Sequence, residues 1–163
     1  MILIASVKLN LKVKEVTEAV QKAARLAMRD TVIAVSADTI EHSPQITGNN
    51  RRSIAGEVSG MGLVVSGGEG QAEGVVDDSK LQGAVYSTSG YGGFLEVGTG
   101  IYGAKGQPIT PKTAKMLVWE GKGGELIFAK AVRGRPATPY FKPAMDRNFT
   151  VEKLSESMKR YLK

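Results

Sequence analysis

The spacing of apolar and polar residues changes several times along the chain, and each change predicts an element. Apolar residues alternate with lysine and asparagine from Val7 to Val13, which is the period of a half-buried strand. Apolar residues then recur at helical spacing, and no Gly or Pro lies between Glu15 and Ser43. We therefore expect a strand and then a long helix, which Pro44 ends because the residue before a proline avoids helical geometry.

The apolar stripe of this helix should face the core, with the lysine and arginine side chains away from its centre. Asp30 falls within the stripe, so it lies either at the solvent-exposed border or beside a partner that holds it, and we favour the border. The expected stripe consists of Ala19, Ala23, Leu26, Ile33, Ala37 and Ile40.

Short apolar runs separated by glycine-rich turns follow Pro44, a pattern typical of antiparallel strands. Arg51-Arg52 should open the first of these strands. The polar segment 67–82 is interpreted as an inserted loop or hairpin. The expected strands are Ser53–Ser59 and Leu63–Ser66 in one hairpin, Gly83–Thr88 as a third strand, and Met116–Glu120 with Glu125–Ala131 in a second hairpin.

Residues 133–139 should form a stiff, basic connector into a C-terminal helix that begins at either Pro139 or Pro143. An apolar stripe from Phe141 to Tyr161 or Leu162 supports that helix. With no βαβ alternation and no clear boundary, the pattern predicts one α+β domain over residues 1–163. Its long N-terminal helix and C-terminal helix would pack on a small antiparallel sheet, to which residues 1–13 add an edge strand.

The amino-acid composition excludes several kinds of reactive and metal-binding site. The 163 residues include no cysteine, and His42 is the one histidine, which removes thiolate chemistry and clustered-histidine metal sites. We expect no metal and no cofactor. No apolar run approaches the roughly 20 residues of a membrane span. Because no secretory leader is visible at Met1–Leu11, we expect folding in a cytosol and no membrane partner.

Charge and glycine are both unevenly distributed. Residues 100–163 contain 13 Lys or Arg and 5 Asp or Glu, whereas residues 1–99 contain 9 and 11. A basic half is compatible with a solvated lysine-rich face, with nucleic acid or with an acidic protein surface. Between Gly60 and Gly106 lie 14 of the 20 glycines, interleaved with apolar residues, which indicates short strands and long turns.

None of the candidate catalytic motifs in the sequence is specific. Gly98-Thr99-Gly100 is not followed by a helical pattern, and Gly103-Ala104-Lys105-Gly106 lacks the spacing of a phosphate-binding loop, so turn glycines explain both. Asp77 and Asp78 are neighbours, which point to opposite faces of a strand or are solvated in a loop. His42, near the end of the long helix, is better explained by the helix dipole than by catalysis. We therefore predict that the chain is not an enzyme.

Binding chemistry is better supported. Guanidinium groups suited to carboxylates or phosphates occur at Arg51, Arg52, Arg133 and Arg135. Aromatic residues lie in or beside the predicted loops, where interface aromatics are common. These aromatic residues are Tyr91, Phe94, Tyr102, Tyr140 and Phe141. For Phe94 and Phe141 the alternative is that the ring anchors its loop on the sheet.

Four stretches in order resemble the tail-completion, or head–tail joining, proteins of long-tailed bacteriophages, which are minor tail or neck proteins. The likeness spans roughly residues 14–160. Ile46 and Asn49-Asn50 depart from the family pattern, and segment 67–82 looks like an insertion. The four stretches are the helix running into Ser43-Pro44 and Thr47-Gly48, Arg51-Arg52-Ser53-Ile54, Tyr91 through Gly100, and Pro111–Trp119 with Val132-Arg133-Gly134 and Pro139–Met145.

The resemblance implies a non-enzymatic virion protein of the phage neck, found in the host cytoplasm during assembly. It would form a ring, expected to be a hexamer, between the head connector or adaptor and the tail terminator or tube, and double-stranded DNA would pass through it. The implied DNA-channel candidates are Arg51 and Arg52. The subunit-interface candidates are Tyr91, Phe94, Glu96, Gly98, Thr99, Tyr102, Arg133, Arg135, Pro139 and Tyr140.

Other functions stay open at this point. A tail terminator or a head-connector subunit would also be a small α+β ring protein. A stand-alone basic module would bind nucleic acid through residues 100–163, with an affinity that falls steeply with salt.

Overall fold

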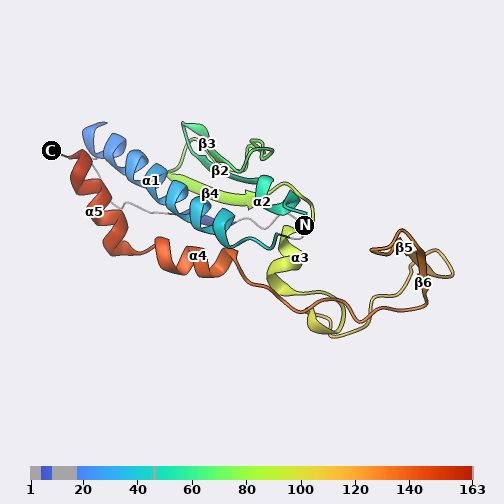
Figure 1. Cartoon of the computed structure of the whole chain (residues 1–163). Coiled ribbons are helices and arrows are strands. Elements are labelled where there is room, and N and C mark those ends of the chain that lie inside the picture. Colours follow the sequence, from blue (N-terminus) through green and yellow to red (C-terminus); the bar gives the residue numbers. More distant parts are fainter. Residues whose placement is uncertain (1–4, 9–17, 46, 163) are drawn as a thin grey trace. The chain divides into compact units, whose positions relative to one another are not determined.

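The computed structural model describes residues 5–8, 18–45 and 47–162, which form two compact units. The first, Met1–Gly93 with Tyr140–Lys163, is called the sheet unit below. The second, Phe94–Pro139, is called the hairpin unit. Long helices and a small antiparallel sheet confirm the predicted α+β class (Figure 1). The prediction of a single domain stays a prediction.

The sheet unit contains a four-stranded antiparallel sheet in the order β1-β4-β2-β3. Its strands are β1 (Ala5–Lys8), β2 (Ile54–Val58), β3 (Gly62–Ser66) and β4 (Gln82–Ser87). The predicted hairpin is therefore confirmed as β2–β3. β1 lies at one edge and β3 at the other. The rest of the expected Val7–Val13 strand, residues 9–13, lies outside the described residues.

One long helix, α1 (Glu18–His42), packs on β2, β3 and β4, and its end before Pro44 matches the prediction. Glycines at two sheet positions allow this close approach. A Cβ at Gly56 would lie 2.7 Å from the Ser36 hydroxyl, and one at Gly83 would lie 3.0 Å from the Met28 sulfur. Because real Cβ atoms do not approach other atoms that closely, a side chain at Gly56 would push α1 away from the sheet.

The buried face of α1 differs from the predicted stripe. Ala19 and Ala37 are exposed and Ile33 is 39% exposed, whereas Thr31 and Thr39 are buried. The stripe was misplaced because α1 is covered on one side by the sheet and on another by the C-terminal helices, so small polar residues are buried as well. Thr31 and Thr39 satisfy their hydroxyl groups by donating to backbone carbonyls four residues earlier, at 3.0 and 2.7 Å.

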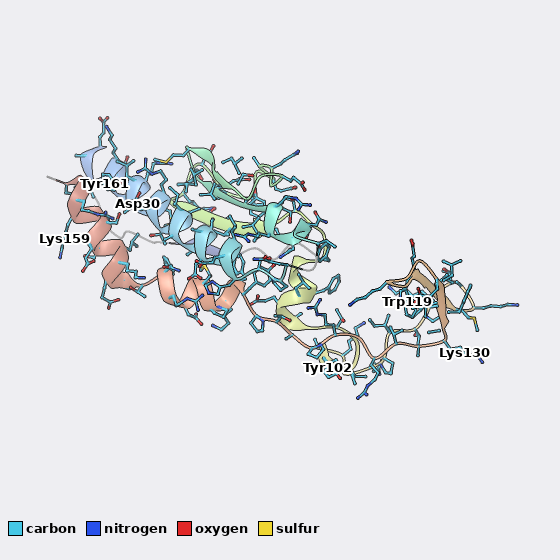
Figure 2. All side chains as sticks on the ribbon, viewed as in Figure 1. Asp30, Tyr102, Trp119, Lys130, Lys159 and Tyr161 are labelled. Atoms are coloured by element: carbon cyan, nitrogen blue, oxygen red, sulfur yellow. The ribbon has the colours of Figure 1, made fainter. Side chains whose placement is uncertain are left out.

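Asp30 is held by partners rather than placed at a solvent-exposed border. Its carboxylate accepts hydrogen bonds from the Ser157 hydroxyl at 2.7 Å and the Tyr161 hydroxyl at 2.8 Å, and it pairs with Arg29 at 3.1 Å. Figure 2 shows Asp30 and Tyr161 together where α1 meets the C-terminal helix. Burial raises the pKa of Asp30, but these hydrogen bonds more than offset that effect and the pKa is lowered.

The predicted C-terminal helix is broken in two. Helix α4 (Phe141–Asn148) begins at neither proline but after Tyr140, and α5 (Val151–Tyr161) follows a break at Phe149 and Thr150. Thr150 has an extended backbone, and its hydroxyl accepts the backbone N–H of Lys153 at 3.3 Å. This N-cap favours a new helix start over continuation, and both helices pack on α1.

Two further expectations are corrected. Arg51 and Arg52 do not open a strand, because they are the last two residues of the short helix α2 (Asn49–Arg52). The backbone N–H of Arg52 donates to the carbonyl of Gly48 at 3.0 Å. The glycine-rich stretch around Phe94, expected as a loop, contains the helix α3 (Gly92–Val97). In both places a short helix satisfies backbone groups that a loop would leave to water.

Segment 67–82, expected to be an inserted loop or hairpin, contains no regular strand before Gln82, yet it is fastened to the sheet. Glu57 of β2 is 2% exposed, and one of its carboxylate oxygens accepts the Tyr86 hydroxyl and the backbone N–H groups of Glu73 at 2.6 Å and Gly74 at 3.1 Å. Burial, and then the hydrogen bond to Glu57, raises the pKa of Tyr86. The segment thus covers the buried carboxylate and phenol.

Removal of the Glu57 carboxylate should destabilise the sheet unit. Glu57→Ala removes the acceptor of the buried Tyr86 hydroxyl and of two partly buried backbone N–H groups, so we expect the free energy of unfolding to fall by about 3 kcal/mol. Glu57→Gln keeps one oxygen acceptor in place and should lose about 1 kcal/mol. Urea unfolding followed by circular dichroism measures both changes. Equal losses for the two variants would contradict the assigned role.

Acid should weaken the contact between α1 and α4 through Asp38. Arg147 donates to both oxygens of this carboxylate, at 2.9 and 2.6 Å, and lowers the pKa of Asp38. Because the folded pKa lies below the unfolded value, the stabilisation is complete above about pH 4 and is lost as the pH falls through the folded pKa. In urea unfolding between pH 5 and pH 2, Asp38→Asn should reduce this acid-dependent loss.

The control for this experiment is Asp146→Asn, which removes a carboxylate that is 62% exposed and pairs with Lys142 on the same helix. It should leave the acid-dependent loss of stability close to that of the wild type. An equal reduction in both variants would contradict the role given to Asp38.

Candidate functional site

The hairpin unit brings together two motifs that lie more than 30 residues apart. Gly98-Thr99-Gly100 runs beside Arg133-Gly134-Arg135. The backbone N–H of Thr99 donates to the carbonyl of Arg135 at 2.9 Å, and that of Ile101 donates to the carbonyl of Arg133 at 2.8 Å. The Thr99 hydroxyl accepts the backbone N–H of Arg135 at 2.9 Å. We call this paired segment the glycine crossing.

Glycine is required at two positions of the glycine crossing. Gly100 and Gly134 have φ values of 62° and 86°, in the left-handed region that other residues avoid. A Cβ at Gly134 would collide with the carbonyl of Thr99, and one at Gly100 with the carbonyl of Arg133. The role of these glycines is therefore close backbone contact between two distant segments.

A groove of about 510 Å³ lies beside the glycine crossing, within the hairpin unit. Its floor is largely apolar, and Arg133 and Arg135, both exposed, line it as well. Ile109 and Val132 hold one side together through two backbone hydrogen bonds of 2.8 and 2.9 Å. The lining residues are Thr99, Ile109, Leu117, Val118, Trp119, Val132, Arg133, Gly134 and Arg135.

The predicted second hairpin is confirmed as β5 (Leu117–Glu120) and β6 (Leu126–Ala129), and it forms a sheet of its own. Opposed residues share a face, so Val118 and Phe128 lie on one face and Trp119 and Ile127 on the other. Val118, Phe128 and Trp119 are 53%, 59% and 41% exposed. Leu126, on the first face, is 64% exposed. The hairpin thus presents apolar side chains on both faces.

Sequence reasoning located this hairpin but did not select its residues as candidates. The available signal was the run Leu126-Ile127-Phe128 opposite Leu117-Val118-Trp119. Two strands that are apolar at consecutive positions cannot bury both faces within a two-stranded sheet. To use this signal, one must know which strands pair and whether another layer covers the hairpin. Only the tertiary structure shows both.

The remaining interface candidates are divided between surface and interior. Phe94, Tyr102 and Pro139 are exposed, and Tyr91 is half-buried. Tyr140 is 2% exposed, and its hydroxyl donates to the carbonyl of Gly92 at 3.3 Å.

Glu96 and Gly98 are also buried, and so is Phe141. The anchoring alternative therefore fits Phe141 but not Phe94, which is 46% exposed.

The two DNA-channel candidates belong to α2 in the sheet unit. Arg52 is paired with Glu69 at 2.8 Å and also donates to the carbonyl of Thr47 at 3.3 Å. Arg51 is half-buried. The Arg52 charge is therefore paired with a neighbouring carboxylate of the same chain.

Within residues 5–8, 18–45 and 47–162, no group of three or more His, Asp or Glu residues is arranged to hold a metal ion. Among the helices in those ranges, none has the length and apolar character needed to cross a membrane. Comparison with family models, with curated proteins and with solved structures gave no match for this chain.

Because a Cβ at Gly134 would collide with backbone, we expect two alanine substitutions in the hairpin unit to lower its stability by different amounts. Gly134→Ala should cost several kcal/mol, because it adds a collision with backbone to the roughly 1–2 kcal/mol of a left-handed alanine. Gly106→Ala is the matched control, since Gly106 has φ 59° with nothing within 4 Å of the added Cβ. Gly106→Ala should lose only the free energy needed to hold an alanine in the left-handed conformation.

Amide hydrogen exchange at Thr99 and Ile101 measures the effect, because both amides donate across the glycine crossing. Faster exchange in Gly134→Ala than in Gly106→Ala is expected. Equal exchange in the two variants would show that the close contact is not what holds the crossing together.

Proposed function

We propose that this chain is a structural subunit of a phage neck, in a homo-oligomeric ring that joins the tail to the head connector. One observation carries the proposal: the β5–β6 hairpin exposes apolar side chains on both faces. Monomeric soluble proteins rarely leave a large contiguous apolar surface uncovered, so such surfaces mark sites of protein contact. The resemblance of the sequence to tail-completion proteins supports the same conclusion.

The groove beside the glycine crossing suits protein contact as well. An apolar side chain of a partner would fill its floor, while carboxylates of the same partner pair with Arg133 and Arg135. Arginine and aromatic residues are enriched at the centres of protein interfaces. In the proposed neck, the partners are further copies of this chain, the head connector or adaptor, and the tail terminator or tube.

The proposal includes transient passage of double-stranded DNA through the ring. A channel wall should not grip DNA, because each neutralised phosphate adds salt-sensitive affinity. The pairing of Arg52 with Glu69 is compatible with this requirement. A tail terminator or a head-connector subunit would use the same kind of surface, and the position of the gene relative to the portal and tube genes distinguishes these roles.

Deletion of the gene tests the proposal in the virus that encodes it. We expect DNA-filled heads and separate tails that do not join, with infectivity restored when the wild-type gene is supplied from a plasmid. Electron microscopy of the lysate and plaque counts measure both. Normal infectious particles without the protein would refute the neck function.

A second candidate, binding of nucleic acid, is favoured by the charge of the hairpin unit. This unit contains seven Lys or Arg residues and three Glu residues, and both Tyr102 and Trp119 are more than 40% exposed. Basic surfaces with exposed aromatic rings bind nucleic acid. Submicromolar binding to a DNA duplex that weakens steeply between 50 and 200 mM salt would support it. No gel shift at low salt would remove it.

A further inference from the structure

The hairpin unit interrupts the sequence of the sheet unit. The chain leaves the sheet unit after Gly93 and returns to it at Tyr140. The two ends of the interruption lie side by side, because the Tyr140 hydroxyl donates to the carbonyl of Gly92 at 3.3 Å, and both residues are buried. Within the hairpin unit, the backbone N–H of Thr138 donates to the carbonyl of Leu95 at 2.8 Å. A short link could therefore join the two ends.

The apolar core belongs to the sheet unit. Among the described residues, every buried hydrophobic side chain lies in Met1–Gly93 or Tyr140–Lys163. The hairpin unit, all of which is described, has two buried residues, Glu96 and Gly98. Because burial of apolar surface is the dominant favourable contribution to folding, the main driving force for folding lies in the sheet unit.

The two sequence segments of the sheet unit hold each other directly. Nε and Nη2 of Arg147, on α4, donate to the Asp38 carboxylate of α1 at 2.9 and 2.6 Å. The Ser157 hydroxyl of α5 donates to Asp30 of α1 at 2.7 Å. Both C-terminal helices also pack along α1. None of these contacts involves residues 94–139, so the C-terminal helices are held on α1 by contacts of the sheet unit itself.

From these observations we infer that the sheet unit folds without the hairpin unit, which is an accessory segment inserted in its sequence. The inference deepens the proposed function and rests on it in one respect, because the surface assigned there to protein contact becomes removable without unfolding the rest of the chain. Loop-closure entropy rises only slowly with loop length, so a long insertion between adjacent ends changes the stability of the sheet unit little. Folding and contact are thus carried by different parts of one chain.

Substitutions that weaken one unit at a time test the inference in the 163-residue chain. Gly134→Ala, expected to weaken the glycine crossing, should raise amide hydrogen exchange at Thr99 and Ile101 at least roughly tenfold. Exchange at Ser59 and Thr88, whose backbone N–H groups donate within the sheet unit at 3.0 Å, should change less than about twofold. The urea midpoint from circular dichroism should match the wild type, because the long helices lie in the sheet unit.

Glu57→Ala provides the reverse comparison, since it weakens the sheet unit. It should raise exchange at Ser59 and Thr88 and lower the urea midpoint, while exchange at Thr99 and Ile101 stays within about twofold of the wild type. A urea midpoint that falls as far in Gly134→Ala as in Glu57→Ala would overturn the inference, because it would show that the two units unfold together.

Removal of the hairpin unit is the direct test. In this variant a short glycine–serine linker replaces residues 96–137 and joins Leu95 to Thr138, whose backbones are already hydrogen-bonded. The variant should unfold cooperatively, with a urea midpoint close to that of the wild type. A second variant with a longer linker of the same composition controls for strain at the join. Loss of cooperative unfolding in both variants would contradict an independent sheet unit.

The same deletion distinguishes this inference from the proposed function. When it is supplied from a plasmid to the virus that lacks the gene, the shortened protein should accumulate in soluble form and should not restore infectivity. Restored infectivity would overturn the assignment of contact to the hairpin unit. Normal particles without any copy of the gene would refute the neck function instead, and the exchange and unfolding measurements would still decide whether the sheet unit folds without the hairpin unit.

Discussion

The close approach of α1 to the sheet is the contact on which the rest of the sheet unit depends. It is possible because Gly56 and Gly83 place no side chain between strand and helix. With α1 on one face, the opposite face of β2 and β4 must be covered by something else, and segment 67–82 does this through the buried carboxylate of Glu57. Helices α4 and α5 then complete the burial of α1 from its other side.

The two units differ in how far they bury the apolar side chains of their strands. In the sheet unit every residue of β2 and β4 is buried, so both faces of the central strands are covered by the chain itself. In the hairpin unit the strands have no second layer within Phe94–Pro139, and their apolar side chains stay exposed. A unit held together by backbone hydrogen bonds and glycine contacts keeps its shape while its apolar surface remains available to a partner.

Polar groups inside the sheet unit contribute specificity as well as stability. Asp30 and Asp38 join α1 to α5 and to α4, each through side chains more than 100 residues away in sequence. Their carboxylates have lowered pKa values, so the contacts are complete at neutral pH. These bonds fix how the two C-terminal helices lie along α1, which apolar packing alone specifies less tightly.

Local patterns were enough to determine the long helix ending before Pro44, both hairpins and the α+β class, because each depends on periodicity or turn residues within a short stretch. The tertiary structure decided which face of α1 is buried, the division of the C-terminal helix at Thr150 and the partners of Asp30, since these depend on elements that arrive from elsewhere in the chain. It also decided that Gly100 and Gly134 lie against each other's backbone. A glycine pattern shows only that a side chain is missing, and which distant segment occupies that space is set by the fold.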